Sequence, residues 1–356
     1  MNIKKILIVI IVILLAVAVI ATLFGGGGAF KSGPKQDVSI AVTGDVMLAR
    51  NVPGVLSFDT SPYDGVSNVT SNVDLLLINF ESASTSSYPA VKGDVPLNCD
   101  PSYVPLAKGN NLTVAALANN HVCDHGIDGM KDTIKHVSDA GMIPIGAGAN
   151  EDEAHRPANV MVKDRNITIL NYMDSNNFAE YGYDVMPYAN GSSPGYSAYN
   201  SQVAQKQINE SRQNGSDFII VFMHYGNEYS MSPNEDQTRI SHELIDYGAD
   251  VVIGSHPHVT QGIEMYNGKP IFYSLGDFIF DLEREDTLSA YFVQMELIND
   301  TCECTIYPVS ISGYLPHFMD ASSGKALLEG LSPQCDQLEI TDDGIGKLKF
   351  NLTEGD

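Results

Sequence analysis

Residues Val251–Glu264 read VVIGSHPHVTQGIE and place two histidines just after a short apolar run. The β-branched residues Val251–Ile253 predict a buried strand that ends at Gly254. Open α/β sheets bind ligands at the carboxyl ends of their strands, so His256 and His258 are expected at such a place. On an extended segment both imidazoles would lie on one side, because side chains alternate with period two. The stretch predicts either two metal ligands or two histidines of a surface loop.

The same pattern, an apolar run that ends in a polar cluster, occurs at five other places. These runs are Val38–Thr43 before Gly44-Asp45, Leu75–Ile78 before Asn79-Phe80-Glu81, Leu112–Ala118 before Asn119-Asn120-His121, Phe218–Met223 before His224, and Ile271–Leu275 before Gly276-Asp277. Helices are predicted at Ile127–Ala140, Gln202–Asn214 and Asn234–Tyr247, each followed by glycine. Strand–helix alternation indicates a largely parallel, covered sheet, and the shared polar ends indicate one convergent site. The alternative is a set of unrelated turns and caps.

The character of the sequence changes after Asp281. The segments Thr287–Leu297, Thr301–Ser312 and Lys347–Leu352 predict strands without intervening helices, which would complete a second sheet or its edge. The segment Asp174–Ser201 has no clear period, so we expect a long loop, either a substrate-facing lid or an insertion.

The N-terminal region predicts membrane attachment. Ile6–Phe24 is an uncharged apolar run long enough to span a bilayer as a helix. We interpret residues 1–24 as an uncleaved single-pass anchor, with a cleaved signal peptide as the rival interpretation. Residues 25–37 form a Gly-rich linker, and one folded domain is expected at residues 38–356. Lys4 and Lys5 predict a cytoplasmic N-terminus, so we expect the main domain outside the cytoplasm.

The charge of the chain excludes some partners. The formal net charge is -24, with 44 acidic residues against 20 basic ones, which argues against binding nucleic acid through its phosphates. An anionic substrate would need a local positive centre, for which a bound cation is the obvious candidate. The five cysteines form no C-x-x-C pair, and Cys302 and Cys304 would lie on the same side of a strand.

The polar clusters contain the donors of a metal-dependent hydrolytic site. The candidate ligands are Asp45, Glu81, Asn120, His224, His256 and His258. Mixed imidazole and carboxylate donors suit one or two divalent ions of Mn, Fe or Zn. His121 adjoins a candidate ligand and is a candidate for proton transfer or charge stabilisation.

The motifs together resemble the CapA, or poly-γ-glutamate capsule biosynthesis, family. They are GDVMLAR (Gly44–Arg50), NFES (Asn79–Ser82), LANNHVCDHG (Leu117–Gly126), HYGNEY (His224–Tyr229), GADVVIGSHPHVTQGIE (Gly248–Glu264) and YSLGDFIFD (Tyr273–Asp281). That family is similar to the calcineurin-like metallophosphatases. The resemblance implies an α/β fold, a two-sheet β-sandwich flanked by helices, here preceded by the N-terminal transmembrane helix.

The resemblance also implies a role for each candidate. Asp45 and His258 would bind the first metal, and Glu81 would bridge the two metals. The second metal would be bound by Asn120, His224 and His256. His121 would be the catalytic histidine. Three positions depart from the related patterns. Met47 stands where the phosphatases have a histidine ligand, Glu81 where they have aspartate, and Asp277 where the CapA family has asparagine.

Five further positions in these motifs are candidates for substrate contact. They are Arg50, Asn119, Asp124, Glu228 and Tyr229. The alternative is that they support the ligands or form turns.

Three functions remain open. The first is a membrane-anchored, metal-dependent hydrolase in the synthesis or export of poly-γ-glutamate, working with other membrane subunits. The second is a non-catalytic, metal-containing subunit that binds the anionic polymer. The third is a general cell-surface metallophosphoesterase.

Overall fold

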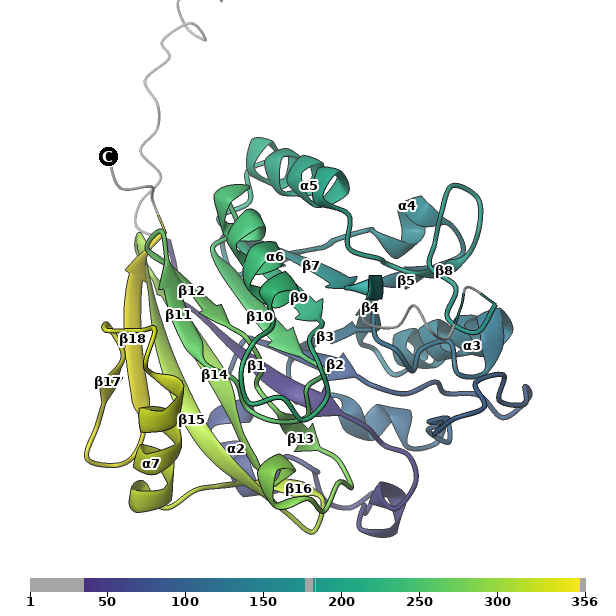
Figure 1. Cartoon of the computed structure of the whole chain (residues 1–356), viewed down its shortest axis with the longest axis horizontal. Coiled ribbons are helices and arrows are strands. Elements are labelled where there is room, and N and C mark those ends of the chain that lie inside the picture. The colour runs from purple at the N-terminus through teal and green to yellow at the C-terminus, as the bar shows by residue number, and fades with distance from the viewer. Residues whose placement is uncertain (1–34, 177–181, 183, 353–356) are drawn as a thin grey trace, which may run out of the picture. The chain divides into compact units, whose positions relative to one another are not determined.

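The computed structural model describes residues 35–176, 182 and 184–352 (Figure 1). Residues 36–356 form one unit of the chain. The expected anchor at residues 1–24 and most of the linker at 25–37 lie outside the described residues. Within the described part, no helix has the length and apolar character that crossing a membrane requires.

Two β-sheets organise the domain. The larger sheet has ten strands: β17 (Glu339–Ile340), β18 (Gly346–Asn351), β15 (Thr301–Ser312), β14 (Ser289–Ile298), β1 (Val38–Val46), β2 (Leu75–Phe80), β3 (Leu112–Ala116) and β4 (Ile143–Ile145) in spatial order, with β13 (Asp277–Ile279) beside β1 and β16 (Leu315–Phe318) beside β15. The smaller sheet has six strands: β11 (Ile263–Tyr266), β12 (Lys269–Phe272), β10 (Val251–Ser255), β9 (Phe218–His224), β7 (Arg165–Met173) and β6 (Ala158–Val162). A small ribbon pairs β5 (Ala147–Gly148) with β8 (Gly195–Tyr196).

The helices connect and cover these sheets (Figure 1). They are α2 (Ser67–Thr70), α3 (Gly126–Asp139), α4 (Glu151–Ala154), α5 (Ser201–Gln213), α6 (Glu235–Asp246) and α7 (Ala321–Leu331), with the short 3₁₀ turns η1 (Val52–Gly54), η2 (Asp64–Val66), η3 (Val104–Ala107) and η5 (Glu285–Thr287). α6 begins with a capping box, in which the Asn234 side chain accepts from the Gln237 backbone and the Gln237 side chain accepts from Asn234.

Side-chain alternation along the strands produces a sandwich. On β2, Leu77 faces the core between the two sheets, whereas Leu76 packs into the cluster on the other face of the large sheet. On β9, Ile220 faces the inter-sheet core and Val221 packs under α5 and α6. The expected mixed α/β architecture with two packed sheets and flanking helices is therefore present in the described residues.

Two sequence-based expectations about the C-terminal part were wrong. The first concerns α7, which interrupts the predicted run of strands. It begins after Asp320, whose carboxylate accepts from the backbone N–H groups of Ser322 and Ser323, and it buries Leu328 and Leu331. β14, β15 and β18 do complete the large sheet, as expected.

The second concerns the predicted strand Ile271–Leu275, which is divided between the two sheets. β12 ends at Phe272 in the small sheet, and β13 begins at Asp277 in the large one. The crossing brings the chain against Gly44 so closely that a Cβ there would lie 1.9 Å from the carbonyl oxygen of Gly276. Asp277 therefore starts a strand instead of following one.

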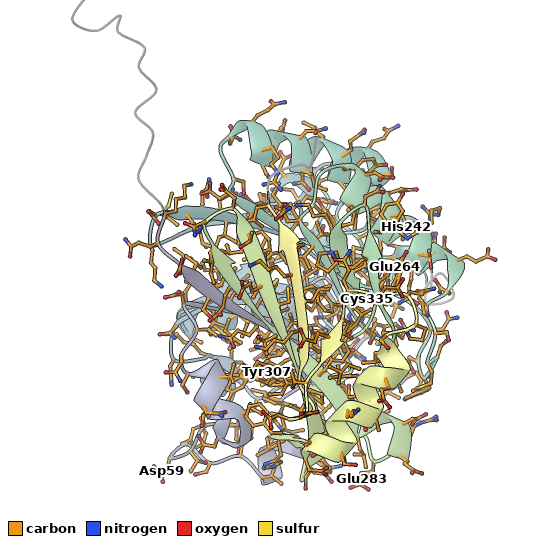
Figure 2. The ribbon with its side chains drawn as sticks, turned by 90° about the vertical axis from the view of Figure 1, so that its left-hand side faces the viewer. Asp59, His242, Glu264, Glu283, Tyr307 and Cys335 are labelled. Atoms are coloured by element: carbon orange, nitrogen blue, oxygen red, sulfur yellow. The ribbon has the colours of Figure 1, made fainter. Side chains whose placement is uncertain are left out.

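The cysteines form no disulfide within the described residues, and the long central segment contains one short strand. All five cysteines lie in the described part of the chain and are free, buried thiols. Figure 2 labels one of them, Cys335. Cys302 and Cys304 lie on the same side of β15, with 3.9 Å between their sulfur atoms. The segment Asp174–Ser201 contains β8, and its residues 177–181 and 183 lie outside the described part.

Candidate metal centre

The site forms where the core between the sheets ends. On β2, Leu77 belongs to that core, and the next residues on the same face are Asn79 and then Glu81. On β9 the inward-facing Phe222 is followed in the same way by His224. In both sheets, the face that builds the hydrophobic core thus turns polar at the carboxyl end of the strand.

Carboxylate and imidazole groups meet there in two overlapping clusters. Asp45, Glu81 and His258 form one, and Glu81, His224 and His256 form the other, with the ligand atoms of each within 4.8 Å of one another. The Oε1 atom of Glu81 lies 3.9 Å from Nε2 of both His224 and His258. Glu81 therefore lies between the other members of the two clusters, where a ligand that bridges two cations would have to lie.

Asn120 joins the second cluster. Its Oδ1 atom lies 2.8 Å from Nε2 of His224. The structure thus brings all six candidate ligands together, at or close to the carboxyl ends of their strands.

The chemistry of the donor set fits a bound cation. Asp45 and Glu81 are fully buried, and burial raises the pKa of both carboxyls, that of Glu81 well above its ordinary value with help from the charge of Asp45. Among the described residues, Oε1 of Glu81 has no hydrogen-bond partner. Buried carboxylates without compensation are costly, so a cation here would supply a missing positive charge. Burial also lowers the pKa of His224 and His256 well below the ordinary value, which keeps both imidazoles neutral and able to bind metal.

The backbone of the two-histidine loop differs from the extended segment that the sequence predicted. His256 and His258 have φ angles of 100° and 58°, in the left-handed region. The chain turns because β10 ends at Ser255, after which the His256 N–H donates to Oδ2 of Asp45 at 3.3 Å. The two rings nevertheless approach one centre, with 6.0 Å between their centroids.

Hydrogen bonds orient the ligands. Asp277 Oδ1 lies 2.8 Å from Nδ1 of His258, which leaves Nε2 of that ring for a metal. Burial lowers the pKa of His258, but the charge of Asp277 and its hydrogen bond outweigh burial and raise it to about 9. Asn79 Nδ2 donates to Asp45 at 2.7 Å and to Glu81 at 3.3 Å. The sequence signal for Asn79 was a polar residue at an inward position of an apolar strand.

The candidate catalytic residue His121 is held by a carboxylate. Its Nδ1 atom lies 2.7 Å from Oδ2 of Asp124, so Nε2 is the nitrogen left for proton transfer. Burial lowers the pKa of His121, and Asp124 opposes that effect. Lys92 lies beside Asp124, with 3.7 Å between Nζ and Oδ1, lines the cleft, and donates to the Asn120 carbonyl at 3.3 Å. Lys92 was not predicted, because a single lysine in a Pro- and Gly-containing loop forms no pattern.

A cleft of about 360 Å³ opens onto this centre. His121, His256 and His258 line it, as do three of the substrate-contact candidates, Arg50, Glu228 and Tyr229.

The other two substrate-contact candidates lie behind the cleft wall. Asn119 is buried and donates to Asn79 Oδ1 at 3.1 Å and to the Phe80 carbonyl at 2.9 Å. Asp124 is buried against His121. Neither residue is among those that line the cleft, and both hydrogen-bond to neighbouring groups of the site.

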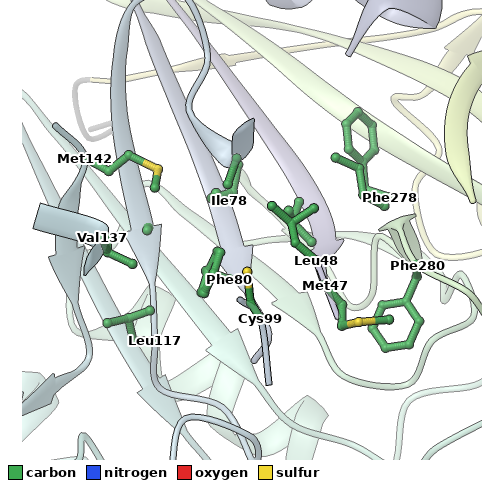
Figure 3. Close-up of a cluster of buried hydrophobic side chains, with 14 of the residues drawn as sticks. Met47, Leu48, Ile78, Phe80, Cys99, Leu117, Val137, Met142, Phe278 and Phe280 are labelled. Carbon is green, nitrogen blue, oxygen red and sulfur yellow. The ribbon is translucent and has the colours of Figure 1, made fainter. Parts of the chain in front are cut away.

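Met47 does not replace the missing histidine ligand. It belongs to the apolar cluster on the outer face of the large sheet, together with Phe278 and Phe280 (Figure 3). Its sulfur accepts a hydrogen bond from the Ala49 N–H at 3.0 Å. Met47 therefore adds no donor to the cluster of Asp45, Glu81 and His258, which keeps three candidate protein ligands.

The sequence resemblance is confirmed by comparison with known proteins. Residues 39–282 match the family described as bacterial capsule synthesis protein PGA_cap, and the chain belongs to this family. The PGA biosynthesis protein CapA of Bacillus subtilis is 30% identical over 329 residues, which cover 90% of this chain and 83% of that one. The capsule biosynthesis protein CapA of Bacillus anthracis is 29% identical over 291 residues, covering 79% and 69%. A probable polyglutamine synthesis accessory protein of Mycobacterium tuberculosis is 31% identical over 252 residues, covering 68% and 66%.

Similarity to solved structures is distant. The protein TT1561 of Thermus thermophilus aligns with a TM-score of 0.40 and 8% identity, over 72% of this chain and 94% of that one. The sulfate thiohydrolase SoxB of Thermus thermophilus aligns with a TM-score of 0.35 and 14% identity, over 67% and 45%. Scores this low add nothing to the family assignment.

Proposed function

We propose that this protein acts in the synthesis or export of an anionic capsule polymer of the poly-γ-glutamate type and carries a metal-dependent hydrolytic centre. The names of its relatives in Bacillus subtilis and Bacillus anthracis support the polymer. Residues 1–24 would anchor the chain in the membrane, with the main domain outside the cytoplasm beside other membrane subunits of a polymer-producing complex.

The observation that carries the proposal is the position of Glu81. Its buried carboxylate lies 3.9 Å from an imidazole nitrogen of each cluster, His224 on one side and His258 on the other. A bound divalent cation of Mn, Fe or Zn supplies Lewis acidity and neutralises negative charge during hydrolysis of an ester or amide bond. One or two such ions would have ligands from Asp45, Glu81 and His258, and from Glu81, Asn120, His224 and His256.

The remaining polar groups would transfer a proton and bind the substrate. His121 is oriented by Asp124 and would move a proton at its Nε2 atom, next to the candidate ligand Asn120. The cleft also carries Arg50 and Lys92, which are positive in a chain of net charge -24 and suit a carboxylate-rich polymer.

A specific observation favours a second candidate, a non-catalytic subunit that binds the polymer through its metal centre. Met47 is buried among apolar side chains, so the first cation position lacks one of the ligands that the related phosphatases use. A weakly occupied position would hold anionic chains without turning them over. The same ligand deficit makes a general metallophosphoesterase the weaker alternative.

A His121→Ala variant of the full-length chain separates these functions. Metal content should stay unchanged, because His121 is not a member of either ligand cluster, and unfolding should stay cooperative although the buried Asp124 loses a hydrogen-bond partner. Polymer output in cells that depend on this chain should fall by about two orders of magnitude or more, the lower end of the range for losing a general acid or base. Normal output from this variant would favour the binding subunit. Turnover of an aryl phosphate that requires His258 would instead support the phosphoesterase.

A further inference from the structure

Glu228 lies over the centre from the cleft side. One of its carboxylate oxygens and a ring nitrogen from each of His256 and His258 lie within 4.8 Å of one another. These two histidines belong to different cation positions. We propose that Glu228 is an additional metal ligand, a second carboxylate that reaches both positions from the cleft. This inference rests on the metal centre of the proposed function.

The placement of Glu228 complements that of Glu81. Glu81 is fully buried and reaches the centre from the floor of the site, whereas Glu228 is exposed and lines the cleft. The first cation position has only three candidate protein ligands because Met47 faces the apolar cluster. A carboxylate next to His258 would give that position a fourth protein donor, a common coordination number for transition metals.

The loop that carries Glu228 is fixed against the two-histidine loop. The Tyr229 N–H donates to the Pro257 carbonyl at 2.8 Å, and Tyr229 itself has a left-handed φ of 62°. On the other side, Gly226 has a φ of 96°, and a Cβ there would lie 2.5 Å from the Gln237 side chain. Only glycine fits at position 226, because any Cβ would collide with the Gln237 side chain. The backbone on both sides of Glu228 therefore has a defined position.

Buried amides extend this support. The Gln237 amide donates to Oε1 of Gln261 at 2.7 Å, and the Gln261 amide donates to the carbonyls of Ser230 at 2.8 Å and Ser232 at 3.1 Å. Gln237 and Gln261 are both buried. The Glu228 loop is thereby attached to α6 and to the segment after β10, which presents the carboxylate in a defined place, as a metal ligand requires.

The test measures Mn²⁺ binding to the purified full-length chain. Titration calorimetry gives the affinity, and electron paramagnetic resonance gives the spectrum of the bound ion. Glu228→Gln should weaken at least one Mn²⁺ site by about tenfold or more, the lower end of the range for disturbing a ligand environment. It should also change the resonance spectrum of the bound ion. The control is Asp94→Asn, which removes the same charge from the wall of the same cleft but belongs to none of the ligand clusters among the described residues.

The outcomes separate ligation from a general charge effect. A large effect of Glu228→Gln with little effect of Asp94→Asn supports the proposal. Equal effects of the two variants, or normal Mn²⁺ binding and an unchanged spectrum in Glu228→Gln, would overturn it and leave the proposed metal centre intact. Failure of the unmodified chain to bind Mn²⁺, Fe or Zn at all would overturn both.

Discussion

Asp45 and Asp277 lie opposite each other on neighbouring parallel strands and share one histidine between them. They are partners in the register of β1 and β13. Nδ1 of His258 lies 2.8 Å from Oδ1 of Asp277 and 3.5 Å from Oδ2 of Asp45. Two segments far apart in the sequence therefore orient a single candidate ligand.

We expect Asp277→Asn to weaken metal binding without removing it. Asparagine can still accept a hydrogen bond from His258, but it loses the negative charge that makes the imidazole a better donor to a cation. The affinity should fall by about tenfold, as for other partners of metal-bound histidines. Titration calorimetry measures this effect, with Asp281→Asn as a control because Asp281 is a buried carboxyl paired with Arg50 outside the ligand clusters. An affinity equal to that of the unmodified chain would show that the Asp277 charge does not act on the centre.

Metal affinity should fall as the pH falls. Burial and the neighbouring Asp45 raise the pKa of Glu81 well above its ordinary value, and Asp277 helps to raise the pKa of His258 to about 9. His258 holds a proton in the metal-free protein near neutral pH, and the raised pKa of Glu81 favours its protonated form, so a bound cation competes with protons at both groups. Each displaced proton lowers the apparent affinity by up to about tenfold per pH unit of acidification. Calorimetry between about pH 6 and pH 8, in buffers of different ionisation enthalpy, counts these protons, and a constant affinity with no proton release would contradict the prediction.

Introducing histidine at Met47 should not restore a ligand. The side chain is fully buried in the apolar cluster with Phe280, so an imidazole there would lose solvation without reaching the ions. Met47→His should lower the free energy of unfolding by about 2 kcal/mol or more, whereas the volume-conserving Met47→Leu should cost less than about 1.5 kcal/mol. Denaturant unfolding and metal stoichiometry are the measurements. A gain of metal affinity in Met47→His would mean that this side chain faces the centre.

Close packing at Gly44 predicts a local stability effect beside the site. A Cβ on Gly44 would lie 1.9 Å from the Gly276 carbonyl oxygen, so Gly44→Ala must separate β1 from the segment before β13. Overpacking of this kind costs about 1–3 kcal/mol. The matched control is Gly54→Ala, because no atom lies within 4 Å of a Cβ at that position. Similar thermal unfolding of the two variants would contradict the contact.

The sequence predicted the parts of the site that depend on local pattern. Apolar runs that end in Asp, Asn, Glu or His mark strand ends, and parallel neighbours bring those ends together. For this reason Asp45, Glu81, Asn120, His224, His256 and His258 could all be named before the structure was known.

The features that were missed depend on contacts distant in sequence. The left-handed turn at His256 could not be read from side-chain alternation, because that rule holds only for extended backbone. The division of Ile271–Leu275 between two sheets reflects the crossing at Gly276, and the approach of Lys92 to Asp124 depends on how a loop folds back. α7 was missed although Asp320 caps it, because the surrounding segments read as strands.

The decisive measurement is the transition-metal content of the full-length chain and of its Glu81→Gln variant, after incubation with Mn, Fe or Zn and removal of free ions. Glu81 is the one candidate ligand shared by the Asp45 and His224 clusters among the described residues. We expect the unmodified chain to retain metal and Glu81→Gln to lose it while keeping its thermal unfolding cooperative. No metal in the unmodified chain, or full metal content in Glu81→Gln, would contradict a metal centre bridged by Glu81.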